Sequence, residues 1–316
     1  MKCLCCGKEI INPTQNEIES LWHHACLKRF FSTDTLPELD LSKDALDEIV
    51  KSSINNGFTI TGVQKKLSLH LSTIPTPRLT IVNYPIGYIL KPQTEEYENL
   101  PEYEYITMRM ANAIGINTVP FGLIKSKNEF AYITKRVDRM QIGKTQFSKL
   151  AMEDFCQLDE RLTQDKYKGS YEACGKIINK YSSQAALDIS EFFLRIVFSF
   201  VVGNSDMHLK NFSLIYKDNK YSLSPAYDML PVNIILPEDT EQTALTLHGK
   251  KRNIKKKDFI ECALTIGLNE KVALNLINSI VKKKQTLFAL CDESYLKDDQ
   301  INALKELIEN RINILA

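Results

Sequence analysis

Two carboxylates and an amide in the second half of the chain are spaced as phosphoryl transfer requires. Asp206 and Asn211 lie five residues apart within the segment 203–211, GNSDMHLKN. Asp228 follows a stretch, 212–223, whose apolar runs and central turn predict a strand pair. Phosphoryl transfer needs a carboxylate that orients the attacking hydroxyl and oxygen ligands that hold magnesium. The spacing therefore favours Asp206 as the catalytic carboxylate, with Asn211 and Asp228 as magnesium ligands.

Two further side chains of the same loop could contact a nucleotide. His208 could hydrogen-bond the loop or ATP, and Lys210 could offset charge on the transferring phosphoryl group. Aspartate and asparagine also cap helices and turns in many proteins, and on that alternative Asp206 and Asn211 would have no chemical role. The strand pair and Asp228 that follow the loop favour the catalytic interpretation.

The first half of the chain contains residues suited to binding phosphates. The segment 59–66, TITGVQKK, predicts a glycine-containing loop whose backbone N–H groups could cradle a phosphate, with Lys66 adding charge. Lys91 ends an apolar strand, 88–91, where a kinase places its phosphate-contacting lysine. Glu104 on the next helix could pair with that lysine. A plain hairpin turn, and a lysine that extends from a strand end into solvent, are the alternatives.

The elements that must position these residues follow from hydrophobic periodicity. Strand-like runs dominate the first half and helical spacing dominates the second, which predicts an α+β protein with a strand-rich lobe and a mainly helical lobe. A cleft between two such lobes is a favoured place for a ligand. Besides the strand pair, with its turn at 218–219, we expect strands within 58–71 and at 88–91 and 131–134, a turn at 56–57, and helices at 39–54, 103–114, 152–158, 170–181, 189–202, 257–265, 271–284 and 298–314.

Six short segments share their sequence and their order with one family of proteins. They are 62–66 (GVQKK), 89–92 (ILKP), 135–139 (KRVDR), 153–157 (EDFCQ), 203–214 (GNSDMHLKNFSL) and 227–230 (YDML). On these segments the chain resembles the HipA-type kinases, the serine/threonine kinase toxins of bacterial HipBA and HipBST toxin–antitoxin systems. The resemblance runs from about residue 57 to the end of the chain and implies a two-lobed, protein-kinase-like fold.

The resemblance implies a role for each matching residue. Asp206 is similar to the catalytic aspartate, and Asn211 and Asp228 are similar to the magnesium ligands. The segment 135–137 is similar to the hinge that lines adenine, although Lys-Arg-Val stands where the family often has Glu-Arg-Phe. Backbone contacts to adenine would survive that difference. The resemblance places at ATP the residues Thr61, Gly62, Val63, Gln64, Lys65, Lys66, Lys91, Lys135, Arg136, Val137, His208, Lys210 and Tyr227.

The chain is similar to the short form of the family. Full-length HipA has an additional N-terminal subdomain before the glycine-containing loop, and we expect it to be absent here, as in HipT, the kinase of HipBST systems. HipT-like kinases autophosphorylate on a Ser-x-Ser pair before the loop glycine, and Thr59 and Thr61 hold those positions here, so we expect autophosphorylation on threonine. The family also implies an aminoacyl-tRNA synthetase as substrate, whose phosphorylation inhibits translation, and HipB-like and HipS-like antitoxin proteins as partners.

Cysteine and histidine near the N-terminus have the spacing of a structural zinc site. Two close pairs, each with two intervening residues, supply the ligands Cys3, Cys6, His23 and Cys26. Thiolate and imidazole ligands suit tetrahedral zinc. Cys5 and His24 are alternative ligands, and a cluster of reduced thiols is the alternative to a metal site.

Composition limits the class of protein. With 40 Lys and Arg against 39 Asp and Glu among 316 residues, the net charge does not favour nucleic-acid binding, so we expect no direct DNA binding. The most apolar run, 192–202, is too short to cross a bilayer and contains Arg195. The N-terminus lacks a signal pattern. We therefore expect a cytoplasmic protein without membrane contact, whose eight cysteines are thiols or metal ligands.

The leading hypothesis is a serine/threonine protein kinase that uses ATP and Mg²⁺. We expect a zinc-knuckle module at 1–35, a kinase N-lobe with the phosphate-binding loop at 36–150, and a helical C-lobe with the catalytic and metal-binding loops at 151–316. A small-molecule phosphotransferase of the aminoglycoside-kinase kind shares the same spacing, but the acidic pocket that it would need has no counterpart in the sequence. A catalytically inactive binding module is the third candidate, and the complete set Lys91, Asp206, Asn211 and Asp228 speaks against it.

Overall fold

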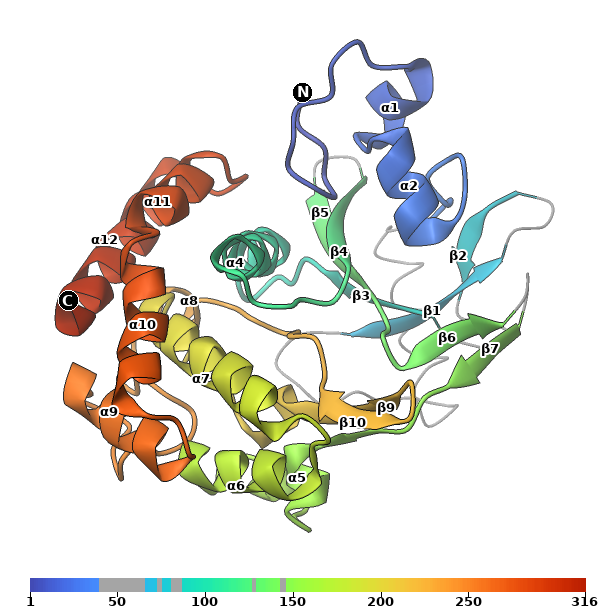
Figure 1. Ribbon diagram of the computed structural model, residues 1–316. Coiled ribbons are helices and arrows are strands. Elements are labelled where there is room, and N and C mark those ends of the chain that lie inside the picture. Colours follow the sequence, from blue (N-terminus) through green and yellow to red (C-terminus); the bar gives the residue numbers. More distant parts are fainter. Residues whose placement is uncertain (40–65, 73–75, 81–86, 127–128, 143–145) are drawn as a thin grey trace. The chain divides into compact units, whose positions relative to one another are not determined.

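The chain forms two compact units in the computed structural model, which describes residues 1–39, 66–72, 76–80, 87–126, 129–142 and 146–316 (Figure 1). The expected helix at 39–54, the turn at 56–57 and the first part of the expected strand region lie almost wholly outside the described residues. The units are Met1–Tyr105 with Val119–Ser148, and Ile106–Thr118 with Lys149–Ala316.

An antiparallel five-stranded sheet forms the centre of the first unit (Figure 1). In spatial order its strands are β2 (Arg78–Thr80), β1 (Leu67–Ser72), β3 (Tyr88–Pro92), β5 (Glu129–Lys135) and β4 (Phe121–Ser126). Leu90 of β3 lies opposite Ile133 of β5, and both side chains are completely buried. The strands expected at 88–91 and 131–134 are confirmed. A separate two-stranded sheet pairs β6 (Arg139–Ile142) with β7 (Gln146–Lys149).

Helix α4 (Leu100–Ile114) begins three residues before the expected start and crosses from the first unit into the second after Tyr105. Gly115 follows the helix with a φ of +102°, a left-handed conformation that glycine adopts without steric cost. The expected end of this helix is therefore confirmed.

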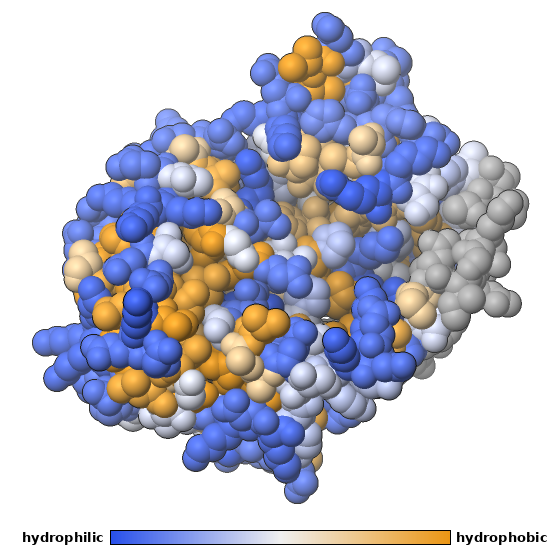
Figure 2. All heavy atoms as spheres, viewed as in Figure 1, coloured by the Kyte–Doolittle hydropathy of each residue, from blue (hydrophilic) through white to orange (hydrophobic). Residues whose placement is uncertain are grey.

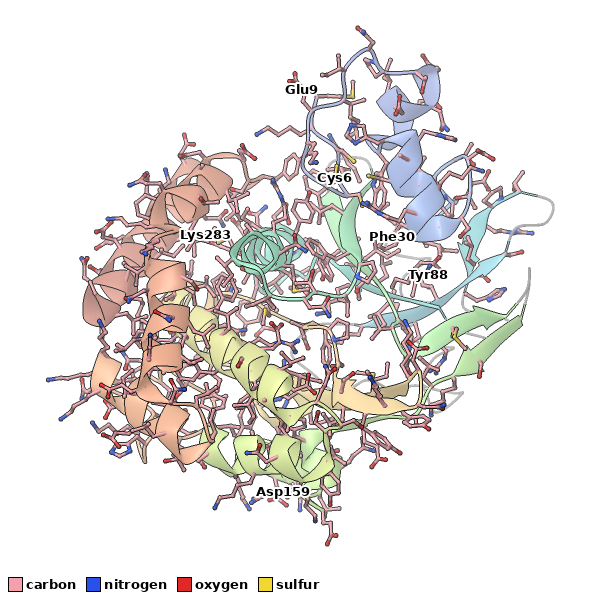
Figure 3. All side chains as sticks on the ribbon, in the orientation of Figure 1. Cys6, Glu9, Phe30, Tyr88, Asp159 and Lys283 are labelled. Carbon is pink, nitrogen blue, oxygen red and sulfur yellow. The ribbon has the colours of Figure 1, made fainter. Side chains whose placement is uncertain are left out.

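The cysteine-containing N-terminal segment packs onto the sheet of the first unit. The Leu123 N–H donates to the Leu4 carbonyl at 2.9 Å, and the Trp22 Nε1–H donates to the Leu123 carbonyl at 2.9 Å. Phe30 and Tyr88, both labelled in Figure 3, pack with their ring centroids 5.7 Å apart. The segment thus shares a buried core with the sheet. Its helices are α1 (Gln15–Ser20) and α2 (His24–Phe31).

The second unit is built around helix α7 (Ala185–Val201), whose residues from Phe192 to Val201 are all buried. Figure 2 shows hydrophobic residues gathered over the helices of this unit. Within the described part of the chain, no helix is both long and apolar enough to cross a membrane. The other helices are α5 (Phe155–Leu158), η1 (Thr163–Asp165), α6 (Tyr171–Tyr181), η2 (Leu209–Asn211), α8 (Val232–Ile235), α9 (Lys256–Thr265), α10 (Glu270–Val281), α11 (Lys284–Asp292) and α12 (Asp298–Leu315).

A small sheet in the second unit corrects one expected helix. The strands β8 (Met152–Asp154), β9 (Ser213–Lys217) and β10 (Lys220–Leu223) lie in the order β10-β9-β8. The expected helix at 152–158 is wrong for its first three residues, because they pair with β9, and Asp154 then caps the short helix α5. The expected helix at 271–284 ends at Val281, and a second helix begins at Lys284.

Candidate active site

Lys91 is held in the first unit by a buried ion pair. Its Nζ lies 2.6 Å from Oε1 of Glu104, and the two side chains are only 4% and 1% exposed. The Nζ atom also lies 5.5 Å from the centroid of the Tyr132 ring. The expected pairing of Lys91 with Glu104 is confirmed. In protein kinases an ion pair between a strand lysine and a helix glutamate accompanies the active arrangement.

The expected adenine hinge, Lys135 to Val137, follows directly after β5. The Lys135 N–H donates to the Pro120 carbonyl at 3.0 Å, and the Arg136 N–H donates to the Gly87 carbonyl at 2.9 Å. Burial lowers the pKa of Lys135. Since both N–H groups already have partners within the first unit, a backbone contact to adenine here would have to use other atoms of the segment.

The candidate catalytic loop leaves α7 at Gly203. This glycine has a φ of +71°, and a Cβ atom on it would lie 2.4 Å from the Leu307 side chain, so another residue would be strained and would clash. The Asp206 N–H donates to Oδ1 of Asn204 at 3.3 Å, and the Asp206 carbonyl accepts from the His208 N–H at 2.8 Å. These local bonds fix the backbone on both sides of Asp206.

Asn211 and Asp228, the two expected magnesium ligands, are joined in the second unit. Nδ2 of Asn211 donates to the Asp228 backbone carbonyl at 3.3 Å. Asn211 is 4% exposed, and its buried Oδ1 has no hydrogen-bond partner among the residues that the structure describes. Asp228 has a φ of +58°, an uncommon conformation for a residue other than glycine. A buried oxygen without a partner costs free energy, and a hard cation would satisfy it, so this pair fits magnesium.

Lys210 and Tyr227 contribute mainly to the shape of the loop. Nζ of Lys210 lies 2.6 Å from Oδ2 of Asp154, which also caps α5. The Tyr227 hydroxyl donates to the Lys210 carbonyl at 3.0 Å and lies 2.7 Å from Oγ of Ser213. Burial raises the pKa of Tyr227, so its hydroxyl remains a donor. In this arrangement the Lys210 charge is already compensated by a carboxylate.

Sequence reasoning missed Tyr167, which contacts the candidate catalytic carboxylate directly. The Tyr167 hydroxyl donates to Oδ1 of Asp206 at 2.7 Å, and the Tyr167 ring meets the His208 ring edge-on with centroids 5.0 Å apart. Partial burial, followed by the bond to Asp206, raises the pKa of Tyr167. The two bonded residues are 39 positions apart in the chain, so no local pattern connects them.

The predicted phosphate-binding loop falls almost entirely outside the described residues. Lys66 is described: it lies immediately before β1 and is half-buried. The remaining predicted residues of this loop lie outside the described residues; they are Thr59, Thr61, Gly62, Val63, Gln64 and Lys65.

The four expected zinc ligands gather in the N-terminal segment. One ligand atom from each of them lies within 4.8 Å of all the others, and Sγ of Cys6 is 3.4 Å from Nδ1 of His23. Sulfur ligands that lie about 2.3 Å from a tetrahedral zinc are about 3.8 Å from one another. Hydrogen bonds with the Cys26 and Cys3 thiols lower the pKa of Cys6. The donor set therefore has the dimensions and the chemistry of a zinc site.

The backbone shapes this cluster as a metal knuckle. Gly7, with a φ of +71°, donates its N–H to the Cys3 carbonyl at 2.8 Å and so closes the turn through Cys6. Nε2 of His23 lies 3.2 Å from the Glu9 carbonyl, and Figure 3 labels Cys6 and Glu9 in this segment. That contact makes Nε2 the protonated nitrogen and leaves Nδ1 as the ligand atom, as in many histidine–metal sites.

The two alternative ligands have other partners. The Cys5 thiol donates to the Phe121 carbonyl at 3.8 Å, and Nε2 of His24 lies 2.9 Å from Oδ1 of Asp34. The cluster that could hold a metal is therefore formed by Cys3, Cys6, His23 and Cys26.

The family model of the HipA-like C-terminal domain matches residues 58–287 of the chain. The chain belongs to the HipA-like family. A protein of Haemophilus influenzae that is provisionally named a kinase is 30% identical to this HipA-like chain in an alignment of 312 residues that covers 88% of each chain. The serine/threonine-protein kinase toxin HipA of Shewanella oneidensis is 27% identical in an alignment of 166 residues that covers 47% of this chain and 37% of that one.

Solved structures show the same fold. HipA of Shewanella oneidensis, in a complex with HipB and operator DNA, superposes with a TM-score of 0.69 at 19% identity, over 88% of this chain and 72% of that one. The proinflammatory kinase CtkA of Helicobacter pylori superposes with a TM-score of 0.53 at 16% identity, over 73% of this chain and 90% of that one. The expected α+β HipA-like fold is confirmed, and the relatives support a HipA-like kinase.

Proposed function

We propose that this HipA-like chain is an ATP-dependent serine/threonine protein kinase. One observation carries the proposal: Asn211 is bonded through Nδ2 to the backbone of Asp228, while its buried Oδ1 finds no partner in the described part of the chain. A residue that served only to shape the loop would be expected to have both ends of its amide bonded. The arrangement is that of a ligand prepared for a cation, five residues after the carboxylate of Asp206.

The residues would divide the work of phosphoryl transfer. Asp206 would accept a hydrogen bond from the substrate hydroxyl and orient it for attack. Asn211 and Asp228 would supply oxygen ligands to magnesium, which when bound offsets the phosphate charge. Lys91, fixed by Glu104, would hold the ATP phosphates in place.

The substrate class and the biological system belong to the same proposal. We infer that the acceptor is a serine or threonine of an aminoacyl-tRNA synthetase, and that the chain is a toxin which inhibits translation. HipB-like and HipS-like proteins would be its antitoxin partners. The support is family membership, the named function of the Shewanella oneidensis HipA relative, and the HipB bound to HipA in the solved complex.

A labelling experiment tests the proposed activity. The purified chain is incubated with radiolabelled ATP and Mg²⁺, first with a bacterial lysate and then with the small-molecule fraction alone. Label on serine or threonine of a lysate protein is the expected result. Label that appears only on small molecules would favour the small-molecule phosphotransferase, and a complete lack of transfer would leave the binding module.

We also propose that Cys3, Cys6, His23 and Cys26 hold one structural zinc ion. Zinc of this coordination type stabilises small modules because the ligands are brought together only in the folded state. Metal analysis of the purified protein is expected to give about one zinc per chain. A zinc content below about a tenth of an equivalent, where a full structural site would hold one ion, would contradict the proposal.

A further inference from the structure

The segment 166–171, which leads into α6 and includes its first residue, is attached to the candidate catalytic loop at three points. The Leu209 N–H donates to the Lys166 carbonyl at 3.1 Å, and the Tyr171 hydroxyl donates to the Met207 carbonyl at 3.1 Å. Between these two attachments, the Tyr167 hydroxyl donates to Oδ1 of Asp206 at 2.7 Å. The first two contacts use backbone atoms of the loop, whereas the third reaches the carboxylate itself.

The ring of Tyr167 makes two further contacts, one with His208 and one with Lys166. Its ring meets the His208 ring edge-on, at an interplanar angle of 77°, and the Lys166 Nζ lies 4.9 Å from its centroid. These contacts restrict the ring without burying it, since Tyr167 remains 44% exposed. A substrate hydroxyl that reached Asp206 would therefore lie within contact distance of the Tyr167 hydroxyl.

We propose that Tyr167 is a positioning residue, which fixes the Asp206 carboxylate in the orientation that accepts the hydroxyl of the protein substrate. The final torsion of an aspartate side chain is broad, so an unsupported carboxylate samples many orientations. A hydroxyl bonded to an ionised carboxylate is a strong, short contact that narrows this range. An ionised carboxylate offers about four acceptor positions, so the bond from Tyr167 does not prevent a second one from the substrate.

The raised pKa of Tyr167 agrees with this role, because the hydroxyl stays protonated and continues to donate throughout the neutral range. The inference rests on the proposed kinase function, since positioning matters only if Asp206 orients a hydroxyl.

The test compares two conservative variants. Tyr167→Phe removes only the hydroxyl and keeps the ring against His208, while Tyr181→Phe changes an exposed tyrosine at the end of α6 as a matched control. Transfer of label from ATP to lysate protein is measured against ATP concentration, together with thermal unfolding. Tyr167→Phe is expected to lower the rate at saturating ATP by roughly tenfold, the value of one hydrogen bond to a charged group. Its KM for ATP and its unfolding temperature should match those of the control.

The outcomes separate this inference from the kinase proposal. If the unmodified chain transfers no label, the kinase proposal fails. If the unmodified chain is active and Tyr167→Phe is equally active, only the positioning role fails. A faster Tyr167→Phe variant would also overturn the role, because Tyr167 would then compete with the substrate for Asp206. Phosphate found by mass spectrometry on Tyr167 itself would overturn it too, since the hydroxyl would then be the acceptor.

Discussion

At the scale of single residues, the buried ion pair of Lys91 and Glu104 links function to stability. Because both side chains are almost completely buried, removing one charge takes away an oppositely charged group at 2.6 Å that solvent cannot replace. Glu104→Gln is therefore expected to lower the free energy of unfolding by about 3 kcal/mol in urea denaturation. Adding Lys91→Met should recover part of that loss, since neither charge then remains.

A matched control for this pair lies in the second unit. Glu293 pairs with Arg109 at 3.3 Å, but the glutamate is 42% exposed, so solvent screens the interaction. Glu293→Gln should change the free energy of unfolding by less than about 1 kcal/mol. Equal losses for Glu104→Gln and Glu293→Gln would mean that the burial of Lys91 has no energetic consequence.

For Asn211 we expect a substitution to lower the activity while leaving the stability almost unchanged. Asn211→Ala removes a buried oxygen without a partner together with one hydrogen bond of 3.3 Å. We expect the free energy of unfolding to change by less than about 1 kcal/mol, because the two effects oppose each other. Label transfer should fall by roughly tenfold to a hundredfold and need more Mg²⁺. Asn179→Ala, which alters an exposed asparagine of α6, is the control, and an Asn211→Ala variant with normal Mg²⁺ dependence would argue against the ligand role.

The two threonines before the loop glycine give a further residue-scale prediction. A phosphate on Thr59 or Thr61 would add about 1.5 to 2 negative charges at neutral pH. The double variant Thr59→Ala, Thr61→Ala is expected to lose label incorporated into the chain itself while still labelling lysate protein. Undiminished self-labelling in the double variant would refute autophosphorylation at this pair.

Residue types and spacing were enough to nominate Asp206, Asn211 and Asp228, because their positions are close in the chain and separated by a recognisable strand pair. Tyr167 could not be found in the same way. Its bond to Asp206 exists only because the segment before α6 returns to the loop, and tyrosine has no spacing signature. Residues that act through a contact between distant segments can therefore be identified only once the fold is known.

At the scale of elements, the segment that contains the proposed zinc ligands packs against an edge strand of the five-stranded sheet, β4. The N-terminal segment exchanges backbone contacts with β4 through Leu4 and Leu123, and Trp22 packs so tightly that a Cβ on Gly122 would lie 2.6 Å from its ring. Loss of the metal should therefore loosen β4 as well as the segment.

Removal of the metal tests this coupling. Cys26→Ser is expected to lower the zinc content, and to lower the unfolding temperature by roughly 2 to 3 °C, as the loss of one or two kcal/mol does in a chain of this size. Cys5→Ser, which changes a neighbouring cysteine that is not one of the four clustered residues, serves as the control. Cysteine thiols bind metal only after they lose their proton. Zinc should therefore also dissociate more readily as the pH falls. An equal zinc content in the two variants would contradict the assignment of ligands.

The helices with long apolar periodicity, such as α7, could be predicted from sequence, whereas the strand β8 could not. Met152 to Asp154 are extended because they pair with Ile215, Leu214 and Ser213 of β9, a contact that spans about sixty residues of chain. The intrinsic conformational preferences of three residues predict a short edge strand poorly. The pairing with β9 determines the conformation of β8.

At the scale of the whole molecule, the residues predicted for phosphoryl transfer are divided between the two compact units. Lys91 and Glu104 belong to the first unit, and Asp206, Asn211 and Asp228 belong to the second. Balanced charge and an ordinary composition gave no indication of this chemistry. The family resemblance arose from six short segments, and the match over residues 58–287 confirmed it.

The most direct test of the kinase proposal is label transfer by the unmodified chain beside Asp206→Asn, which keeps the shape of the side chain but removes its negative charge. Thermal unfolding is first measured for both proteins, to establish that the substitution leaves the unfolding temperature unchanged. Both proteins are then incubated with radiolabelled ATP, Mg²⁺ and lysate. The proposal predicts phosphorylated serine or threonine with the unmodified chain and at least a hundredfold less with Asp206→Asn, about the contribution of a well-placed acid–base group. Equal labelling by the two proteins would contradict it.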